Sequence, residues 1–312
     1  MTESSSNKPL RILMVVGAYA PEPVGGSERQ CALLTEALIE RGHSVDVVTL
    51  RHQRASLSAE ERALFRLYRL GRFGPFAFAF KRTLESLLGR LPLVSLDGAR
   101  VLAFWIGLPG VWLARFEFLK ALKRFAAQSQ GRYDLVHVHE SGWLAGASVA
   151  QWQPSGVPVI CKEATSPAMG VIGFDTPRRG QLDDARRKAS AWIAQTEAVR
   201  SELPALLTSE SPVALVPNAV VVPDAAADPV SERVLYVGNL SQGAHWKGFD
   251  VLFDAWVKVV AQRPGAKLSV VGGGDAALLG AQLVGVRVAA REQPLRRGEL
   301  GGVAEPRAVG VA

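Results

Sequence analysis

The sequence predicts an α/β protein in which two sheets of parallel strands follow one another along the chain. Through the first two thirds, apolar runs of strand length alternate with helical patterns, which is typical of a parallel sheet. Near residue 233 the rhythm starts again, with a strand, a glycine turn, a helix and a second strand. A chain of 312 residues, 48% of them hydrophobic, is long enough to form two separate cores.

The first sheet is predicted from six short apolar runs, of the kind found in strands that are buried on both faces. They are Arg11–Val16, Ser44–Leu50, Leu135–His139, Pro158–Cys161, Trp192–Thr196 and Val213–Val216. A helical pattern at Ser27–Arg41 lies between the first two. The stretch PDAAADP at residues 223–229 has no large apolar side chain, so we expect it to be the linker that follows an N-terminal domain of residues 1–222.

Residues 51–132 do not follow this alternation of strands and helices, and they account for the chain's net excess of positive charge. They contain 15 Lys and Arg against 5 Asp and Glu, a net charge of +10, whereas the whole chain carries +7. Apolar and aromatic groups alternate with the basic ones at roughly helical spacing, which predicts a basic apolar helical insert. Because the charge is confined to this segment and no nucleic-acid-binding module accompanies it, we expect no nucleic acid partner.

Two interpretations of this insert stay open. It is either a helical lid over a cleft, with its apolar side in the core, or an amphipathic helix lying in the headgroup plane of a membrane, with Trp105 and Trp112 at interface depth. The uncharged stretch Val101–Ala114 has only 14 residues and contains Gly-Leu-Pro-Gly. It is therefore too short and too interrupted to span a bilayer.

The second sheet carries the clearest indication of a ligand. A strand at Val234–Val237 leads to a glycine turn, Lys247 precedes an amphipathic helix, and the next strand ends in Gly272 and Gly273. This order places a cation, a helix N-terminus and backbone N–H groups along the carboxyl edge of a parallel sheet, where open α/β sheets bind ligands. We therefore expect a phosphorylated ligand. The alternatives are a solvated surface lysine and an ordinary glycine-rich strand end.

Several of these segments resemble one enzyme family. Val237–Leu240, Lys247–Leu252 and Pro264–Gly274 resemble the donor half of the family four glycosyltransferases, which are retaining enzymes of the GT-B architecture. Arg11–Val16 with the Gly-Gly loop of residues 21–28, and Val216–Val220, resemble that family's first strand and interdomain signature. The resemblance covers roughly residues 11–50 and 132–275. It implies a GT-B-like fold with a complete N-terminal Rossmann-like acceptor domain and an incomplete second Rossmann-like domain.

The resemblance also implies a reaction. A sugar would pass with retention from a nucleotide-sugar donor to a glycan, a glycolipid or another cell-envelope acceptor. The sequence contains no Asp-x-Asp pair to hold a divalent ion, so we expect neither metal nor cofactor. Lys247 would contact the donor diphosphate. The expected donor-binding residues are Gly25, Gly26, Asn239, Lys247, Gly272 and Gly273, with uncharged Asn239 where the family commonly has Arg.

The catalytic candidates are Glu163 and His139, which follow or end neighbouring strands. His137 and His139 are two apart in a strand and so share a face. Such a pair can bind a metal, but the sequence places no third ligand, and we expect none. The family often has a His where this chain has Ala164. Its role in acceptor positioning would pass to Glu163, Lys162 or His139, or be absent.

The C-terminal part departs from the family's pattern. Residues 223–275 match only the first half of a donor domain, and the Glu-x7-Glu helix that the resemblance implies is not found. We expect residues 276–312 to form an aberrant or disordered tail, from truncation or a frame shift, with a natural low-complexity tail as the other interpretation. Two alternative functions follow: an inactive remnant that binds only membrane or acceptor, and a GT-B nucleotide-sugar epimerase.

The N-terminus MTESSSNKPL has no basic start followed by a long apolar core, as a secretion signal would. Cys31 and Cys161 have no disulfide or metal-ligand spacing. We therefore expect a cytoplasmic protein. In the membrane interpretation of the insert, it would be peripheral on the inner face of an anionic membrane.

Overall fold

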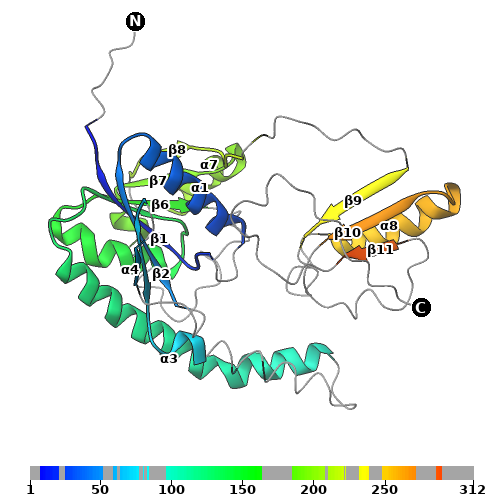
Figure 1. Cartoon of the computed structure of the whole chain (residues 1–312), viewed down its shortest axis with the longest axis horizontal. Coiled ribbons are helices and arrows are strands. Elements are labelled where there is room, and N and C mark those ends of the chain that lie inside the picture. Colours follow the sequence, from blue (N-terminus) through cyan, green and yellow to red (C-terminus); the bar gives the residue numbers. More distant parts are fainter. Residues whose placement is uncertain are drawn as a thin grey trace, which may run out of the picture. The chain divides into compact units, whose positions relative to one another are not determined.

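The chain divides into two compact units, Met1–Val221 and Val222–Ala312. Their elements are labelled in Figure 1, a computed structural model. The structure describes residues 8–20, 25–51, 59–61, 64–76, 80, 83, 96–163, 185–207, 210–220, 222, 232–238, 248–271 and 286–289.

The first unit is built on an eight-stranded sheet of order β3-β4-β2-β1-β5-β6-β7-β8. Seven strands are parallel, and β3 pairs with β4 in the antiparallel sense at one edge. The strands are β1 (Arg11–Val16), β2 (Ser44–Leu50), β3 (Ala59–Glu61), β4 (Arg66–Leu70), β5 (Leu135–Val138), β6 (Val159–Glu163), β7 (Ala191–Ala194) and β8 (Val213–Leu215). The six strands that the sequence predicts for this sheet are therefore confirmed, within three residues at each end.

Helices cover both faces of this sheet (Figure 1). They are α1 (Gly26–Glu40), α3 (Leu96–Gln128), α4 (Trp143–Trp152), α7 (Glu197–Glu202) and the short 3-10 helices η1 (Gln153–Ser155) and η2 (Leu203–Ala205). Alternate residues of β1 enter two different cores, as the period of a strand requires. Met14 packs in the core with Cys31 of α1, whereas Leu13 packs with Phe118 of α3 and Leu144 of α4.

The segment 51–132 is not entirely helical, which corrects our prediction. Arg66–Leu70 forms β4 and extends the parallel sheet beside β2, in register from Asp46 opposite Arg66. Its side chains alternate between fully buried and less buried positions, a period of two that the surrounding basic residues conceal. The interruption expected at Gly-Leu-Pro-Gly is also wrong, since α3 runs through Pro109 without a break.

The C-terminal half of α3 packs on the sheet. Its buried residues Ala114, Phe118, Leu122 and Ala126 recur every four positions and so form one apolar stripe. Leu113 and Phe116 lie outside this stripe and are exposed. In the part of the chain that the structure describes, no helix has the length and apolar content needed to cross a membrane.

The described residues of the second unit form three parallel strands of order β11-β10-β9 and one helix. These elements are β9 (Arg233–Val237), α8 (Phe249–Gln262), β10 (Lys267–Val271) and β11 (Val286–Ala289). Helix α8 packs on the sheet through Phe249 and Trp256, against Leu268 and Val270. Strand β11 lies within the segment 276–312. The rest of that segment and the expected linker 223–229 lie outside the described residues.

Candidate functional site

The amino terminus of α1 meets the end of β5 at the carboxyl edge of the first sheet. Ser27 Oγ donates a hydrogen bond of 2.7 Å to the carbonyl oxygen of His139, which holds the two elements together. One residue earlier the helix begins at Gly26, after Gly25. The backbone N–H of Gly25 donates to Glu28 Oε2 at 2.8 Å. The structure therefore brings three of the predicted site residues together: Gly25, Gly26 and His139.

The two glycines differ in the space around them. A Cβ added at Gly25 would lie 3.0 Å from Glu28 Oε2, whereas one added at Gly26 would meet no atom of the described residues within 4 Å. Backbone N–H groups in the first turn of a helix have no intrahelical partner and favour anions. Gly26 therefore offers a ligand an open approach to this helix N-terminus.

The imidazoles of His137 and His139 share one face of β5, with their ring centroids 4.5 Å apart. Burial, and then the positive charge of Lys162, lower the pKa of His137 to about 4. Burial also holds the pKa of His139 well below its usual value, with His137 and Lys162 adding to the effect. Both rings are therefore neutral at neutral pH. Among the described residues, neither ring nitrogen of His139 has a hydrogen-bond partner.

The second catalytic candidate, Glu163, ends β6 and is 1% exposed. Val138 pairs with Cys161, so Lys162 is the residue of β6 that lies level with His139. Because side chains alternate along a strand, Lys162 shares the face of α1 with His139, and Glu163 shares the opposite face with Cys161. The structure thus places Glu163 at the same edge as His139 but not on the same face.

The segment that leaves β8 is tied to this edge by side chains. Lys162 Nζ donates to Asn218 Oδ1 at 2.7 Å, and Asn218 Nδ2 donates to Gln195 Oε1 at 2.8 Å. The side chain of Gln30 in α1 makes two hydrogen bonds with the backbone of Ala219. Its Nε2 donates to the Ala219 carbonyl at 2.6 Å, and its Oε1 accepts from the Ala219 N–H at 3.0 Å. These contacts fix the end of the first unit.

Sequence reasoning missed Gln30. A usable signal exists, since Gln30 lies four positions after Gly26 and so one turn further along the same side of α1. The sequence does not reveal the contact with Ala219, because the two residues are 189 positions apart.

The other four donor-binding residues, Asn239, Lys247, Gly272 and Gly273, lie outside the described residues. Around them, β9 and β10 are parallel with Val237 paired to Val271, and the Gly238 N–H donates to the Val271 carbonyl at 3.0 Å. Both strands therefore end at one edge. In the described parts of both units, no three His, Cys, Asp or Glu side chains gather as a metal site requires.

A parallel sheet between helices, with a glycine-opened helix N-terminus at its carboxyl edge, defines an α/β protein of the ligand-binding Rossmann type. Residues 25–219 match the family described as glycosyl transferase 4-like domain. The chain belongs to this glycosyltransferase family, which confirms the resemblance seen in the sequence. A search of curated protein sequences gave no match.

Two solved structures, OtsA and HepE, agree on the fold. The trehalose-6-phosphate synthase OtsA is 13% identical, with a TM-score of 0.54, 92% of this chain covered and 74% of that one. HepE from Anabaena, solved with UDP-glucose, is 15% identical, with a TM-score of 0.50 and coverages of 90% and 69%. Sucrose-phosphate synthase from Thermosynechococcus elongatus is 18% identical, with a TM-score of 0.49 and 86% of this chain covered. This chain spans 63% of that synthase. The GT-B-like α/β fold predicted from the sequence is confirmed.

Proposed function

We propose that this chain is part of a retaining glycosyltransferase that uses a nucleotide-sugar donor and needs neither metal nor cofactor. Residues 1–222 would form its acceptor domain, and residues 223–275 would contribute to its donor domain. The observation that carries the proposal is the joining of Gly25, Gly26 and His139 at one sheet edge through the 2.7 Å bond from Ser27. The UDP-glucose bound by the similarly folded HepE supports the donor class.

The proposed roles follow from charge. In glycosyl transfer the leaving diphosphate must be neutralised and the acceptor hydroxyl positioned. The helix N-terminus at Gly26 supplies N–H groups and Lys247 a positive charge, assisted by Asn239, Gly272 and Gly273. His139 is neutral and its ring nitrogens have no hydrogen-bond partner among the described residues, so one of them would accept a hydrogen bond from an acceptor hydroxyl that reaches it. Glu163 contributes a carboxylate at the same edge.

We also propose that the acceptor is a glycan or lipid-linked molecule met at an anionic membrane surface on the cytoplasmic side. The support is a group of exposed side chains on the 72–76 turn and on α3, which we call the aromatic–basic surface: Phe73, Phe76, Leu113, Phe116 and Lys120. The Phe73 N–H donates to Glu117 Oε2 at 2.7 Å, which docks the 72–76 turn on α3. Lys120 Nζ lies 4.4 Å from the Phe116 ring centroid. Aromatic groups flanked by cations suit the headgroup region of a bilayer.

The proposal is tested by binding of UDP- and GDP-sugars to the full chain, measured calorimetrically with and without a chelator. Lys247→Ala should abolish binding, Lys258→Ala on the exposed side of α8 should leave it unchanged, and the chelator should have no effect. Equal loss in both variants, or loss with the chelator, contradicts the donor site. Binding without turnover of any acceptor would favour the inactive remnant. Interconversion of free nucleotide sugars would favour the epimerase.

A further inference from the structure

Lys162 is a buried cation at the candidate site, and it has no carboxylate partner in the described part of the chain. The residue is 6% exposed. Its ammonium donates a hydrogen bond of 2.7 Å to the amide oxygen of Asn218, which is neutral. Burial lowers the pKa of Lys162, because a charged group loses hydration when it leaves water. The described side chains therefore leave this positive charge without compensation.

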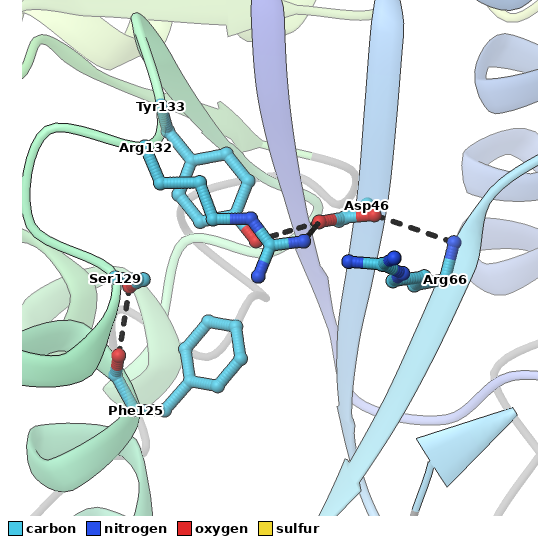
Figure 2. A network of polar contacts seen from close by, with 6 residues as sticks. All are labelled: Asp46, Arg66, Phe125, Ser129, Arg132 and Tyr133. Atoms are coloured by element: carbon cyan, nitrogen blue, oxygen red, sulfur yellow. Dashed lines mark hydrogen bonds and ion pairs between the residues drawn. The ribbon is translucent and has the colours of Figure 1, made fainter. Parts of the chain in front are cut away.

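Two other cations of the first unit do have carboxylate partners. At the amino edge of the sheet, where its strands begin, Arg132 Nη2 donates to Asp46 Oδ2 at 2.7 Å, as Figure 2 shows. Arg11 pairs with Asp134, also at 2.7 Å. Both arginines are more exposed than Lys162 and so lose less hydration. The most deeply buried of these three cations is thus the one that would gain most from an added anion.

Lys162 lies beside the proposed contact of the acceptor. It is level with His139 on the neighbouring strand and shares its face of the sheet. Adjacent strands are about 4.8 Å apart, so the two side chains start close together. Burial is the main cause of the low pKa of His137 and His139, and the positive charge of Lys162 contributes to both. The amino terminus of α1, at the same edge, also favours negative charge.

The present partner of Lys162 can be exchanged at low cost. Asn218 lies in the exposed segment 216–220, so water can bind its amide oxygen once the bond to Lys162 breaks. An ammonium binds an oxyanion more strongly than a neutral amide, because both partners are then charged. A neutral hydroxyl would gain little in the same exchange. The exchange therefore favours an anionic ligand.

We propose that Lys162 binds an anionic group of the acceptor substrate, a phosphate or a carboxylate, which takes the place of the Asn218 amide. This inference rests on the proposed function, in which His139 contacts the acceptor hydroxyl. The acceptor then carries its anionic group close to the hydroxyl that receives the sugar. Loss of the bond to Asn218 also loosens residues 216–220, the segment that leads out of the first unit.

The experiment is hydrogen exchange of the full chain in phosphate, acetate or chloride at equal ionic strength, in a Lys247→Ala background that removes the proposed donor contact. Phosphate or acetate should speed exchange at residues 216–220, whereas chloride should not. In Lys162→Met, exchange there should already be fast, and neither anion should change it. Lys162→Arg should recover part of the response, and Lys123→Met, at an exposed lysine of α3, should respond like its parent.

Asn218→Ala separates this role of Lys162 from a purely structural one. Without the amide no bond has to break before the anion binds, so phosphate affinity measured by calorimetry should rise by roughly tenfold. A lysine that only holds the segment 216–220 gives no such gain. Unchanged or weaker phosphate binding in Asn218→Ala therefore contradicts the exchange.

The proposal is overturned if neither anion changes exchange up to about 100 mM, or if Lys162→Met responds like its parent. A response to phosphate alone assigns a phosphoryl group, and a response to acetate alone a carboxylate. Nucleotide-sugar affinity should be the same in Lys162→Met as in the parent chain. A loss as large as in Lys247→Ala would place Lys162 at the donor diphosphate, and the acceptor assignment would be wrong. Since the exchange test involves no sugar transfer, a failure of the proposed function would not be mistaken for a failure of this one.

Discussion

Lys162 Nζ donates a hydrogen bond of 2.7 Å to Oδ1 of Asn218, 56 residues further along the chain. Lys162 lies level with His139 in the sheet, and Asn218 lies in the segment that leads out of the first unit. The bond therefore links the candidate catalytic edge to the start of the connection to the second unit.

Replacing Lys162 by Met should release residues 216–220. Past Val216, whose N–H donates to the Ala194 carbonyl, this exposed segment is held by the side chains of Lys162, Gln195 and Gln30. A hydrogen bond to a charged group contributes about 1.5 to 3 kcal/mol, so local opening should rise by roughly tenfold or more. Hydrogen exchange measures this. Lys123→Met, an exposed lysine of α3, is the control, and equal exchange in both variants would show that the bond does not hold the segment.

The sequence predicts the buried parallel strands well, but it does not predict the side-chain hydrogen bonds between residues far apart in the chain. Both ends of strand β1 are predicted at the residues where the structure has them, because five successive apolar side chains are buried, alternately on the two faces of the sheet. Strand β4 is missed because Arg69, which reads as a surface residue, is 1% exposed. Its Nη2 donates to the Ala20 carbonyl, 49 residues away, at 2.9 Å. A partner that far along the chain leaves no local pattern, and the same holds for Gln30 and Ala219.

Acidification should destabilise the first unit through His137. The folded protein holds the pKa of His137 at about 4, below the value of about 6.5 in an unfolded chain. The stability that comes from keeping His137 neutral is therefore complete above pH 6.5. About 3 kcal/mol of it is lost as the pH falls toward 4, and His139 acts in the same direction. Urea unfolding between about pH 4.5 and 7.5 checks this, and a His137→Gln variant should have the shallower dependence. If the free energy of unfolding of that variant depends on pH as steeply as that of the parent, groups other than His137 cause the loss of stability.

Asp46→Asn should lower the free energy of unfolding by about 1 to 3 kcal/mol. The substitution weakens the bonds that this buried carboxylate accepts from Arg132 and Tyr133, and leaves a buried group poorly matched to its partners. Asp134→Asn is the matched control, because its bidentate pair with Arg11 is largely exposed and screened by solvent. Denaturant titration should show the larger loss for Asp46→Asn. A larger loss for Asp134→Asn would contradict the view that Asp46 organises this edge.

The aromatic–basic surface should bind anionic vesicles, and binding should weaken as salt rises because each cation near the membrane contributes about 1 kcal/mol that ions screen. A Phe73→Ser, Phe116→Ser double variant should bind roughly tenfold more weakly, since two exposed rings no longer enter the interface. Leu215→Ser, at an exposed apolar residue of β8, should bind like the parent. Vesicle flotation measures this binding. Binding that depends on neither lipid charge nor salt would favour the lid interpretation of the insert.

Gly26→Ala should separate ligand binding from folding. The backbone angle φ at Gly26 is not positive, and an added Cβ meets no atom within 4 Å in the described part of the chain, so the melting temperature should stay within about 1 °C of the parent. If a donor diphosphate or an acceptor approaches the helix N-terminus at this residue, the methyl group will obstruct it, and affinity should fall by about tenfold. Calorimetry with the nucleotide sugar that binds the parent chain gives the affinity, and scanning calorimetry gives the stability.

Gly25→Ala serves as the contrast, because its Cβ would press on the Glu28 carboxylate at 3.0 Å and so should also disturb the start of α1. Unchanged affinity in Gly26→Ala would place the ligand elsewhere along the carboxyl edge.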